Sequence, residues 1–229
     1  MPGKPLMPLG CLPFIVLVWF IFFLPFFLAN VMMEALAKLG ISAQTSVSVI
    51  IWIFMGGLIN IPLRKVPRPH PQEFHPYHFF GMDRWVKEPV LQNYTTIAVN
   101  VGGCVVPVLI CLYEVQRIAA LGTYAVLACA LSTAINIAVC YRFAKPVPKL
   151  GIVMPPLIPA LAAAICALVF LPQFAPPIAF VSGVLGCIVG ADLMHLKDIT
   201  RIDTPIASIG GAGTFDGIII TGLFATILV

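Results

Sequence analysis

Long apolar runs separated by short polar segments form the main pattern of this sequence. Runs of about 20 residues have the length that an α-helix needs to cross the hydrocarbon core of a bilayer. Because each unsatisfied backbone group in that core costs several kcal/mol, we expect each run to be a helix with internal hydrogen bonds. The pattern predicts seven helices, at residues 11–31, 44–63, 94–113, 119–141, 152–171, 177–196 and 206–228.

The composition supports the same class of protein. Hydrophobic residues make up 60% of the 229 residues and charged residues only 10%. The first apolar run follows Lys4, but it is too long for a signal-peptide core and lacks a small-residue cleavage site, so we expect a retained helix. We therefore predict an all-α fold, a polytopic helix bundle that forms a single integral membrane domain over residues 1–229.

The basic residues predict the orientation of this bundle. With seven spans, eleven Lys and Arg residues fall on the side of the N-terminus, and only Lys38 and Arg117 fall on the other. The positive-inside rule then puts the N-terminus in the cytoplasm and the C-terminus outside. The net charge of +4 does not indicate nucleic acid, because the basic residues lie in short loops beside apolar runs. We expect the lipid bilayer as a partner and no nucleic acid.

The longest predicted loop, residues 64–92, is rich in proline, histidine and aromatic residues. Its prolines forbid a regular helix, and its aromatics suit a membrane interface, so we expect it against the cytoplasmic surface. His70, His75 and His78 lack a standard metal-ligand spacing. We expect neither a metal nor a cofactor here.

The cysteines all fall inside or at the edge of apolar runs. This placement is typical of small apolar packing residues and does not indicate a disulfide framework or a metal site. The seven are Cys11, Cys104, Cys111, Cys129, Cys140, Cys166 and Cys187.

Two acidic residues lie inside the apolar runs of the C-terminal part. Asp192 is about one turn from the cytoplasmic end of the sixth run, and Asp216 is in the seventh. An ionised acid at a helix centre costs roughly 2.5 to 3.5 kcal/mol, so such residues usually face a polar interior and mark a functional site. The other seven acids, Glu114 among them, fall in loops or at the ends of runs.

A short loop joins the sixth and seventh runs, so their helices should be antiparallel neighbours whose acids face each other. An unbroken helix from Pro205 would carry Asp216 about 16 Å deep, unless the glycines at 210, 211 and 213 unwind its first part. Two carboxylates within a few Å share a proton and titrate as a unit. Aspartic proteases use such a pair to activate water and to protonate the leaving amine.

Asp192 and the segment "GAGTFDG" resemble the motifs of the GxGD intramembrane aspartyl proteases, the presenilin and signal peptide peptidase group. That group also has a Pro-Ala-Leu motif, and Pro159, Ala160 and Leu161 are similar to it. The resemblance implies that Asp192 and Asp216 are catalytic and that residues 152–229 bear the site. It implies that the following residues bind a membrane-protein or peptide substrate: Gly210, Gly211, Gly213, Thr214, Pro159, Ala160 and Leu161.

The chain also departs from that group in three respects. Its Pro-Ala-Leu motif precedes the two acids, Ala191 stands where a tyrosine is usual, and Thr214 and Phe215 separate the glycines from Asp216. The segment "GGAGTFDGI" also resembles a prokaryotic membrane-protein family of unknown function. That resemblance implies a prokaryotic cytoplasmic (inner) membrane and no particular activity.

Three functions stay open at this stage. The acids could hydrolyse peptide bonds, or they could bind a proton or sodium ion in a transporter or channel built on a broken helix. In the third, the protein is a non-catalytic scaffold whose acids pair with polar neighbours such as Asn100 or Asn136, or with a partner subunit. For single residues the alternatives are an Asp192 pair with Lys197 at the interface, close helix packing at the glycines, and an interhelical hydrogen bond at Asn100. A kinked span is the alternative for Pro155, Pro156 and Pro159. His195 is expected at the interface.

Overall fold

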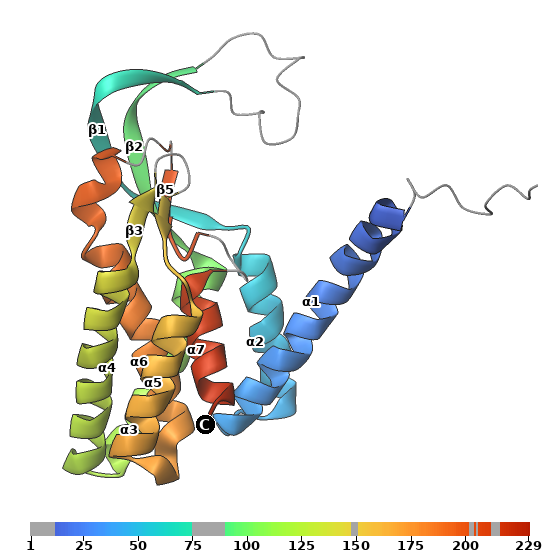
Figure 1. Ribbon diagram of the computed structural model, residues 1–229, viewed down its shortest axis with the longest axis vertical. Helices are drawn as coiled ribbons and strands as arrows, with labels where there is room; N and C mark the ends of the chain where they lie inside the picture. Colours follow the sequence, from blue (N-terminus) through green and yellow to red (C-terminus); the bar gives the residue numbers. More distant parts are fainter. Residues whose placement is uncertain (1–11, 75–89, 148–150, 202–203, 205, 212–215) are drawn as a thin grey trace, which may run out of the picture.

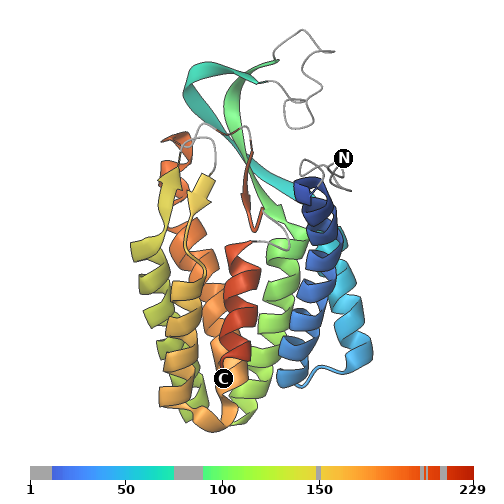
Figure 2. The ribbon, with the colours of Figure 1, turned by 45° about the vertical axis from the view of Figure 1, so that its right-hand side comes forward.

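The computed structural model describes residues 12–74, 90–147, 151–201, 204, 206–211 and 216–229. Within this part, seven α-helices run alternately in opposite directions and form an elongated bundle (Figure 1). Strands gather at one end, which we call the sheet end, and the C-terminus lies at the opposite end (Figure 2). The helices are α1 (Leu12–Lys38), α2 (Ala43–Gly56), α3 (Val106–Ala120), α4 (Thr123–Phe143), α5 (Leu157–Phe170), α6 (Ala175–Gly186) and α7 (Gly217–Ile227).

Shorter helical segments extend or connect these helices. Two of them are π-helical, with one extra residue in each turn, and they continue directly into or out of long α-helices. They are η4 (Val101–Val105) before α3 and η6 (Cys187–Leu193) after α6; the 3-10 segments are η5 (Pro172–Phe174) and η7 (Leu196–Arg201).

Four helical stretches in the described residues are long and apolar enough to cross a membrane: Val16–Lys38, Val101–Ala120, Thr123–Phe143 and Pro172–Asp198. The helices α2, α5 and α7 are apolar but shorter. A helix rises only 1.5 Å per residue, so these three do not by themselves cover the hydrocarbon thickness. The chain is therefore a helical membrane protein, with seven predicted spans of which four have full length.

The all-α prediction is wrong at the sheet end, because the described residues there also form strands. Strand β1 (Asn60–Phe74) pairs antiparallel with β2 (Val90–Asn100), and β2 pairs parallel with β5 (Ile206–Ile209). A separate hairpin contains β3 (Lys145–Val147) and β4 (Gly151–Val153). The prolines of β1 exclude a helix, whereas β2 carries the β-branched run "TTIAV" that favours a strand.

These strands shorten four of the predicted spans. The run 44–63 is helical only as far as Gly56, the run 94–113 begins as strand β2, the run 152–171 begins within strand β4, and the run 206–228 begins as strand β5. Each of these runs is predominantly apolar, and hydropathy alone does not separate a strand from a helix. In the predicted loop 64–92, residues 64–74 and 90–92 belong to the β1–β2 hairpin, which projects from the bundle (Figure 1), and residues 75–89 lie outside the described residues.

Helix α6 is the centre of the bundle, with α3, α4, α5 and α7 packed around it. All of its residues from Pro177 to Val184 are buried. Small residues permit this, since a Cβ atom added to Gly183 would lie 3.1 Å from Cα of Gly222 on α7. Membrane helices commonly approach one another at such small residues, because lipid provides no hydrophobic force between helices.

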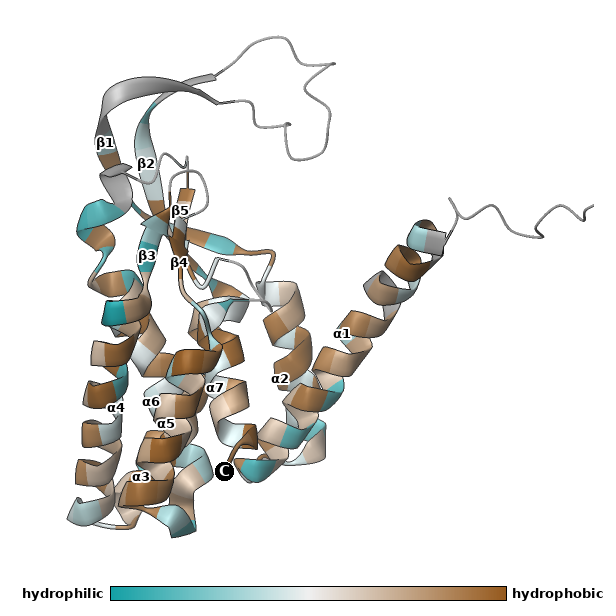
Figure 3. Cartoon of the chain, in the orientation of Figure 1, coloured by the Kyte–Doolittle hydropathy of each residue, from teal (hydrophilic) through white to brown (hydrophobic). Residues whose placement is uncertain are grey.

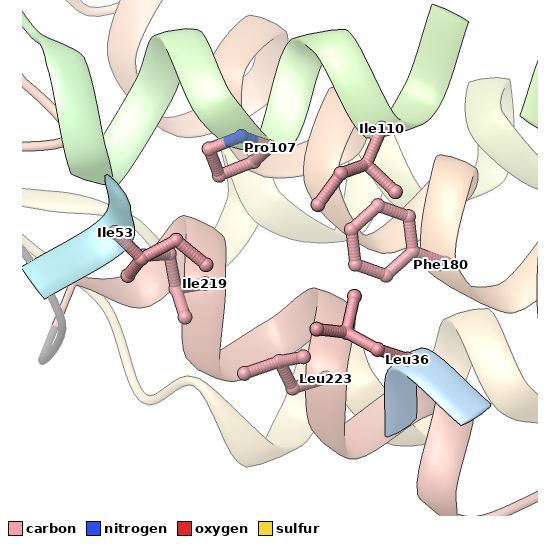
Figure 4. A pocket seen from close by; sticks show the side chains of 7 residues that line it. All are labelled: Leu36, Ile53, Pro107, Ile110, Phe180, Ile219 and Leu223. Atoms are coloured by element: carbon pink, nitrogen blue, oxygen red, sulfur yellow. The ribbon is translucent and has the colours of Figure 1, made fainter. Parts of the chain in front are cut away.

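Hydrophobic residues predominate along the helices of the bundle (Figure 3), and many of their large apolar side chains are exposed. Helix α1 buries residues of its C-terminal part, including Met32 and Leu36, while its N-terminal part stands apart with exposed aromatic side chains. Exposed apolar area on this scale is typical of a surface in contact with lipid. An apolar pocket lies between α1, α2 and the rest of the bundle (Figure 4), lined by Leu36, Ile53, Pro107, Ile110, Phe180, Ile219 and Leu223.

The cysteines within the described residues are free thiols, as the packing interpretation predicts. Five of these six are buried and Cys166 is partly exposed, while Cys11 lies outside the described residues. The Sγ atoms of Cys140 on α4 and Cys187 on η6 are 3.7 Å apart, a contact between two thiols.

Candidate functional site

Asp192 lies in the π-helical segment η6, at the sheet end of the bundle, and its side chain is half-buried. The position within the last turn of the sixth apolar run agrees with the prediction. The π-helical winding was not predicted, and it changes which side chains share a face with the acid. In the described chain Lys197 forms no ion pair with Asp192, so the interfacial pair considered from the sequence is not formed.

Asp216 is the N-cap of α7. Its backbone is extended, with φ −69° and ψ 145°, and its Oδ1 accepts a hydrogen bond of 2.9 Å from the backbone N–H of Ile218. A carboxylate at this position satisfies a free amide and interacts favourably with the positive end of the helix dipole. The acid is therefore at the start of a short helix, not about 16 Å along an unbroken one, because residues 206–209 are a strand.

The two acids lie close enough together for their charges to interact. The backbone N–H of Gly210 is near enough to the Asp192 carboxylate to interact with it, so the segment that leads to Asp216 also approaches Asp192. Cys104 of η4 is near enough to interact with both carboxylates. Three discontinuous segments thus meet around the pair, and joint retention of one proton stays a prediction.

The close contact between Gly210 and Gly103 brings these segments together. Gly210 has a φ of +71°, in the left-handed region where glycine is favoured. A Cβ atom added to Gly103 would lie 2.0 Å from the Gly210 carbonyl oxygen, and one added to Gly210 would lie 2.5 Å from the Gly103 carbonyl carbon. Both positions therefore require glycine. Gly211 is exposed, whereas Gly213 and Thr214 lie outside the described residues.

The fully buried side chain of Asn100 connects three segments, the end of α2, the start of β1 and η4. Its Oδ1 accepts a hydrogen bond of 2.7 Å from the Gly103 N–H, and its Nδ2 donates to the Gly57 carbonyl at 2.8 Å and to Asn60 Oδ1 at 3.1 Å. The hydroxyl of Ser208 on β5 donates to the same Asn60 oxygen at 2.6 Å. From the sequence Asn100 was an interhelical hydrogen-bonding position; in the structure it joins α2, β1 and η4.

The Pro-Ala-Leu residues do not face the acids as a unit. Pro159 and Ala160 are buried in α5, but Leu161 is 50% exposed on the outer surface. The segment just before them contacts α7 instead, since Thr221 Oγ1 donates to the Pro156 carbonyl at 3.3 Å. Pro156 is the N-cap of α5, so the prolines here begin the helix, where the kinked-span interpretation placed a bend inside it.

Several further residues near the acids were not assigned to the site from the sequence. Cys187 Sγ donates to the carbonyl of Gly217 at 3.7 Å, next to Asp216, and lies one π-helical turn before Asp192. The side chain of Met154 lies 3.8 Å from where a Cβ atom of Gly217 would be. These contacts depend on tertiary packing, and no local motif marks them.

His195 is buried and not interfacial. Its Nδ1 lies 2.9 Å from the Ala191 carbonyl, and its ring lies 5.0 Å from the ring of Tyr141. Across the described ranges, no three His, Cys, Asp or Glu side chains are grouped as metal ligands would be. His75 and His78 lie outside those ranges, and the side chain of His70 is not described, so the interpretation of that loop stays a prediction.

Fold and site together define a helical membrane protein with two interacting carboxylates at one end of the bundle. More particularly, the chain belongs to an uncharacterised family, because the family model described as "Protein of unknown function (DUF1614)" matches residues 53–228. No curated protein and no solved structure matches the chain. The match agrees with the resemblance to a membrane-protein family of unknown function and gives no support to the resemblance to the GxGD proteases.

Proposed function

We propose that the protein is an intramembrane aspartyl protease in which Asp192 and Asp216 hydrolyse peptide bonds of membrane-embedded substrates. The observation that carries the proposal is the meeting of two half-buried carboxylates from η6 and α7. In this proposal seven helices cross a prokaryotic cytoplasmic membrane, and the N-terminus and the sheet end face the cytoplasm. The basic residues Arg64, Lys65, Arg142, Lys145 and Lys197 belong to elements of that end.

The chemistry requires one carboxyl to be protonated and the other ionised. The ionised carboxylate takes a proton from a water molecule while the oxygen of that water bonds to the substrate carbonyl carbon. The carboxylic acid gives its proton to the carbonyl oxygen. The tetrahedral intermediate then collapses and the C–N bond breaks. The carboxyl that took the proton from water gives it to the leaving amine, and the other carboxylate takes back a hydroxyl proton of the intermediate, which restores the pair. The Gly210 N–H orients Asp192, and the N-cap bond orients Asp216.

Strand β5 supports the substrate side of this proposal. In the described sheet it is an edge strand, paired with β2 on one side, and it leads directly to the Gly210 contact with Asp192. An extended peptide can add to an open sheet edge through main-chain hydrogen bonds. A substrate segment unwound from its helix would therefore find partners for its backbone beside the acids.

The non-α segments around the acids favour one alternative, a proton-coupled or sodium-coupled transporter or channel. The segments η4 and η6 and the break before α7 release backbone carbonyls from regular helix bonding near the two carboxylates. Broken helices with this character form ion sites in transporters. Variants of Asp192 and Asp216 distinguish the protease from the transporter when peptide cleavage and ion flux are both measured.

The test uses the full chain in liposomes, with a panel of single-span substrates for cleavage and with proton and sodium flux measured in parallel. We expect cleavage by the wild type and none by Asp192→Asn or Asp216→Asn. Asp198→Asn, the same chemical change at the same end of the bundle, is the matched control and should retain cleavage. Ion flux that both variants abolish, with no cleavage by the wild type, would replace the protease with the transporter.

A further inference from the structure

The connection from α2 into β1 exposes an unusually apolar surface. Its side chains lie beyond the last helical turn, where a polar loop would be expected, and they are open to the surroundings. The exposed fractions are 80% for Leu58, 50% for Ile59, 46% for Ile61 and 62% for Leu63. We call residues 58–65 the β1 ribbon.

The apolar surface of the β1 ribbon is continuous with that of α2. Ile51, Trp52 and Met55 are 55%, 60% and 55% exposed and belong to the last turns of the helix. In Figure 3 brown residues occur in α2, in the connection that follows it and in β1, with pale and teal residues between them. A helix face of this kind in a membrane protein contacts lipid, so the surface that continues it meets the same leaflet as the helix ends.

Basic side chains follow the apolar ones in the order found at a membrane interface. Arg64 and Lys65 are exposed, and the Lys65 ammonium lies 4.6 Å from the ring centroid of Tyr94 on β2. Across a membrane interface, apolar side chains usually lie among the acyl chains, aromatic rings lie next to them, and cations lie at the headgroups. Cations at this depth attract anionic lipids.

We propose that the β1 ribbon lies in the headgroup region of the leaflet at the sheet end, with Leu58, Ile59, Ile61 and Leu63 inserted and with Arg64 and Lys65 binding anionic lipid. The occupant of this surface is a lipid leaflet and not a protein, because the ribbon continues a lipid-facing helix and pairs apolar side chains with cations. The sheet β1-β2-β5 is thereby anchored to the membrane beside the acids. The proposal does not depend on protease activity.

Insertion is tested with a single tryptophan. In a background with Trp19, Trp52 and Trp85 replaced by phenylalanine, Leu63→Trp is reconstituted in phosphatidylcholine vesicles with lipids brominated near the carbonyl or deep in the chain. We expect the shallow bromines to quench its fluorescence more strongly. Ile165→Trp, exposed near the middle of α5, is the control that deep bromines should quench more.

If neither brominated lipid quenches Leu63→Trp and its emission is that of a water-exposed indole, the proposal is overturned. The surface then contacts a soluble partner or none. Ile59→Trp repeats the measurement if Leu63→Trp does not fold.

Anionic-lipid binding is tested with Arg64→Gln and Lys65→Gln. The full chain is titrated in vesicles with a quencher-labelled phosphatidylglycerol or phosphatidylcholine, and the preference for the anionic lipid is compared. We expect the preference to fall about fivefold for each cation removed. Lys38→Gln, at the opposite end of the bundle, is the control and should leave it unchanged. An unchanged preference in the double variant would contradict the role of the two cations.

Discussion

Both ends of the bundle contain buried or half-buried acids, but the acids have different partners. At the opposite end Glu114 is fully buried, and its carboxylate oxygens lie 2.9 and 3.1 Å from Nη1 of Arg117. At the sheet end Asp192 interacts with a second acid, Asp216. An acid paired with a cation one turn away has its charge compensated within the fold, whereas two neighbouring acids disfavour each other's ionised form, an arrangement typical of functional sites.

The other contacts around the Glu114–Arg117 pair also differ from those around Asp192 and Asp216. Arg117 also donates to the Leu39 carbonyl and lies 5.5 and 5.4 Å from the ring centroids of Tyr113 and Phe174. Around Asp192 and Asp216 the contacts include a glycine amide, a helix N-terminus and a thiol. The first set holds helices together, and the second positions two carboxylates near each other.

The largest expected effect is on activity at the sheet end. Asp216→Asn should lower cleavage by about three orders of magnitude or more, because the pair acts as a unit. Asparagine is also a good N-cap, so the free energy of unfolding should change by less than about 1 kcal/mol. Cleavage assays and denaturant unfolding in detergent measure the two effects. A stable variant that still cleaves at the wild-type rate would remove Asp216 from the mechanism.

At the opposite end we expect a large effect on stability instead. Glu114→Gln leaves Arg117, a side chain 33% exposed, without its carboxylate, and should destabilise the protein by roughly 2 to 3 kcal/mol. Cleavage by the remaining folded protein should be unchanged. The comparison uses thermal unfolding together with activity per folded molecule. Loss of activity in a fully folded variant would show that Glu114 takes part in function.

Gly103→Ala should disturb the contact that brings Gly210 to Asp192. The new methyl group would lie 2.0 Å from the Gly210 carbonyl oxygen, so the strand must shift and activity should fall at least tenfold. Gly122→Ala is the control, since that glycine has a φ of +104° but nothing within 4 Å. It should cost about 1 kcal/mol of stability and leave activity unchanged. Equal activity in the two variants would contradict the role of the glycine contact.

The smallest expected effect concerns the hydrogen bonds behind that contact. Ser208→Ala removes the 2.6 Å hydrogen bond to Asn60 and should lower the free energy of unfolding by about 1 kcal/mol, with a lower kcat.

Asn60→Asp keeps an acceptor for both Ser208 and Asn100, whereas Asn60→Leu keeps none. We therefore expect Asn60→Asp to retain far more activity than Asn60→Leu. Similar losses in both would indicate a purely steric role for Asn60.

Part of the candidate site could be anticipated from single residues. An acid in an apolar run is costly wherever the run folds, so Asp192 and Asp216 stand out without any knowledge of the fold. The glycines before Asp216 indicate a break in the helix, and the break is present, although part of it is a strand. Glu114, placed at the end of a run by the sequence, is instead fully buried.

Other features could not be anticipated, because they depend on residues far apart in the chain. Thr96 pairs with Ile206, and Gly103 packs on Gly210. Asn100 and Cys104 became neighbours of the site only through these contacts. No periodicity in the two short runs η4 and η6 predicts their π-helical winding either.

The sequence by itself determined that this chain is a helical membrane protein, which segments are apolar and which acids are costly to bury. These properties follow from transfer of each residue from water to lipid, which is a local quantity. Only the tertiary structure decided which apolar segments contain strands, that Asp216 caps a short helix after one of them, and that Glu114 is buried beside a cation. Those outcomes depend on pairing and packing between distant segments, and residue hydropathy contains no information about them.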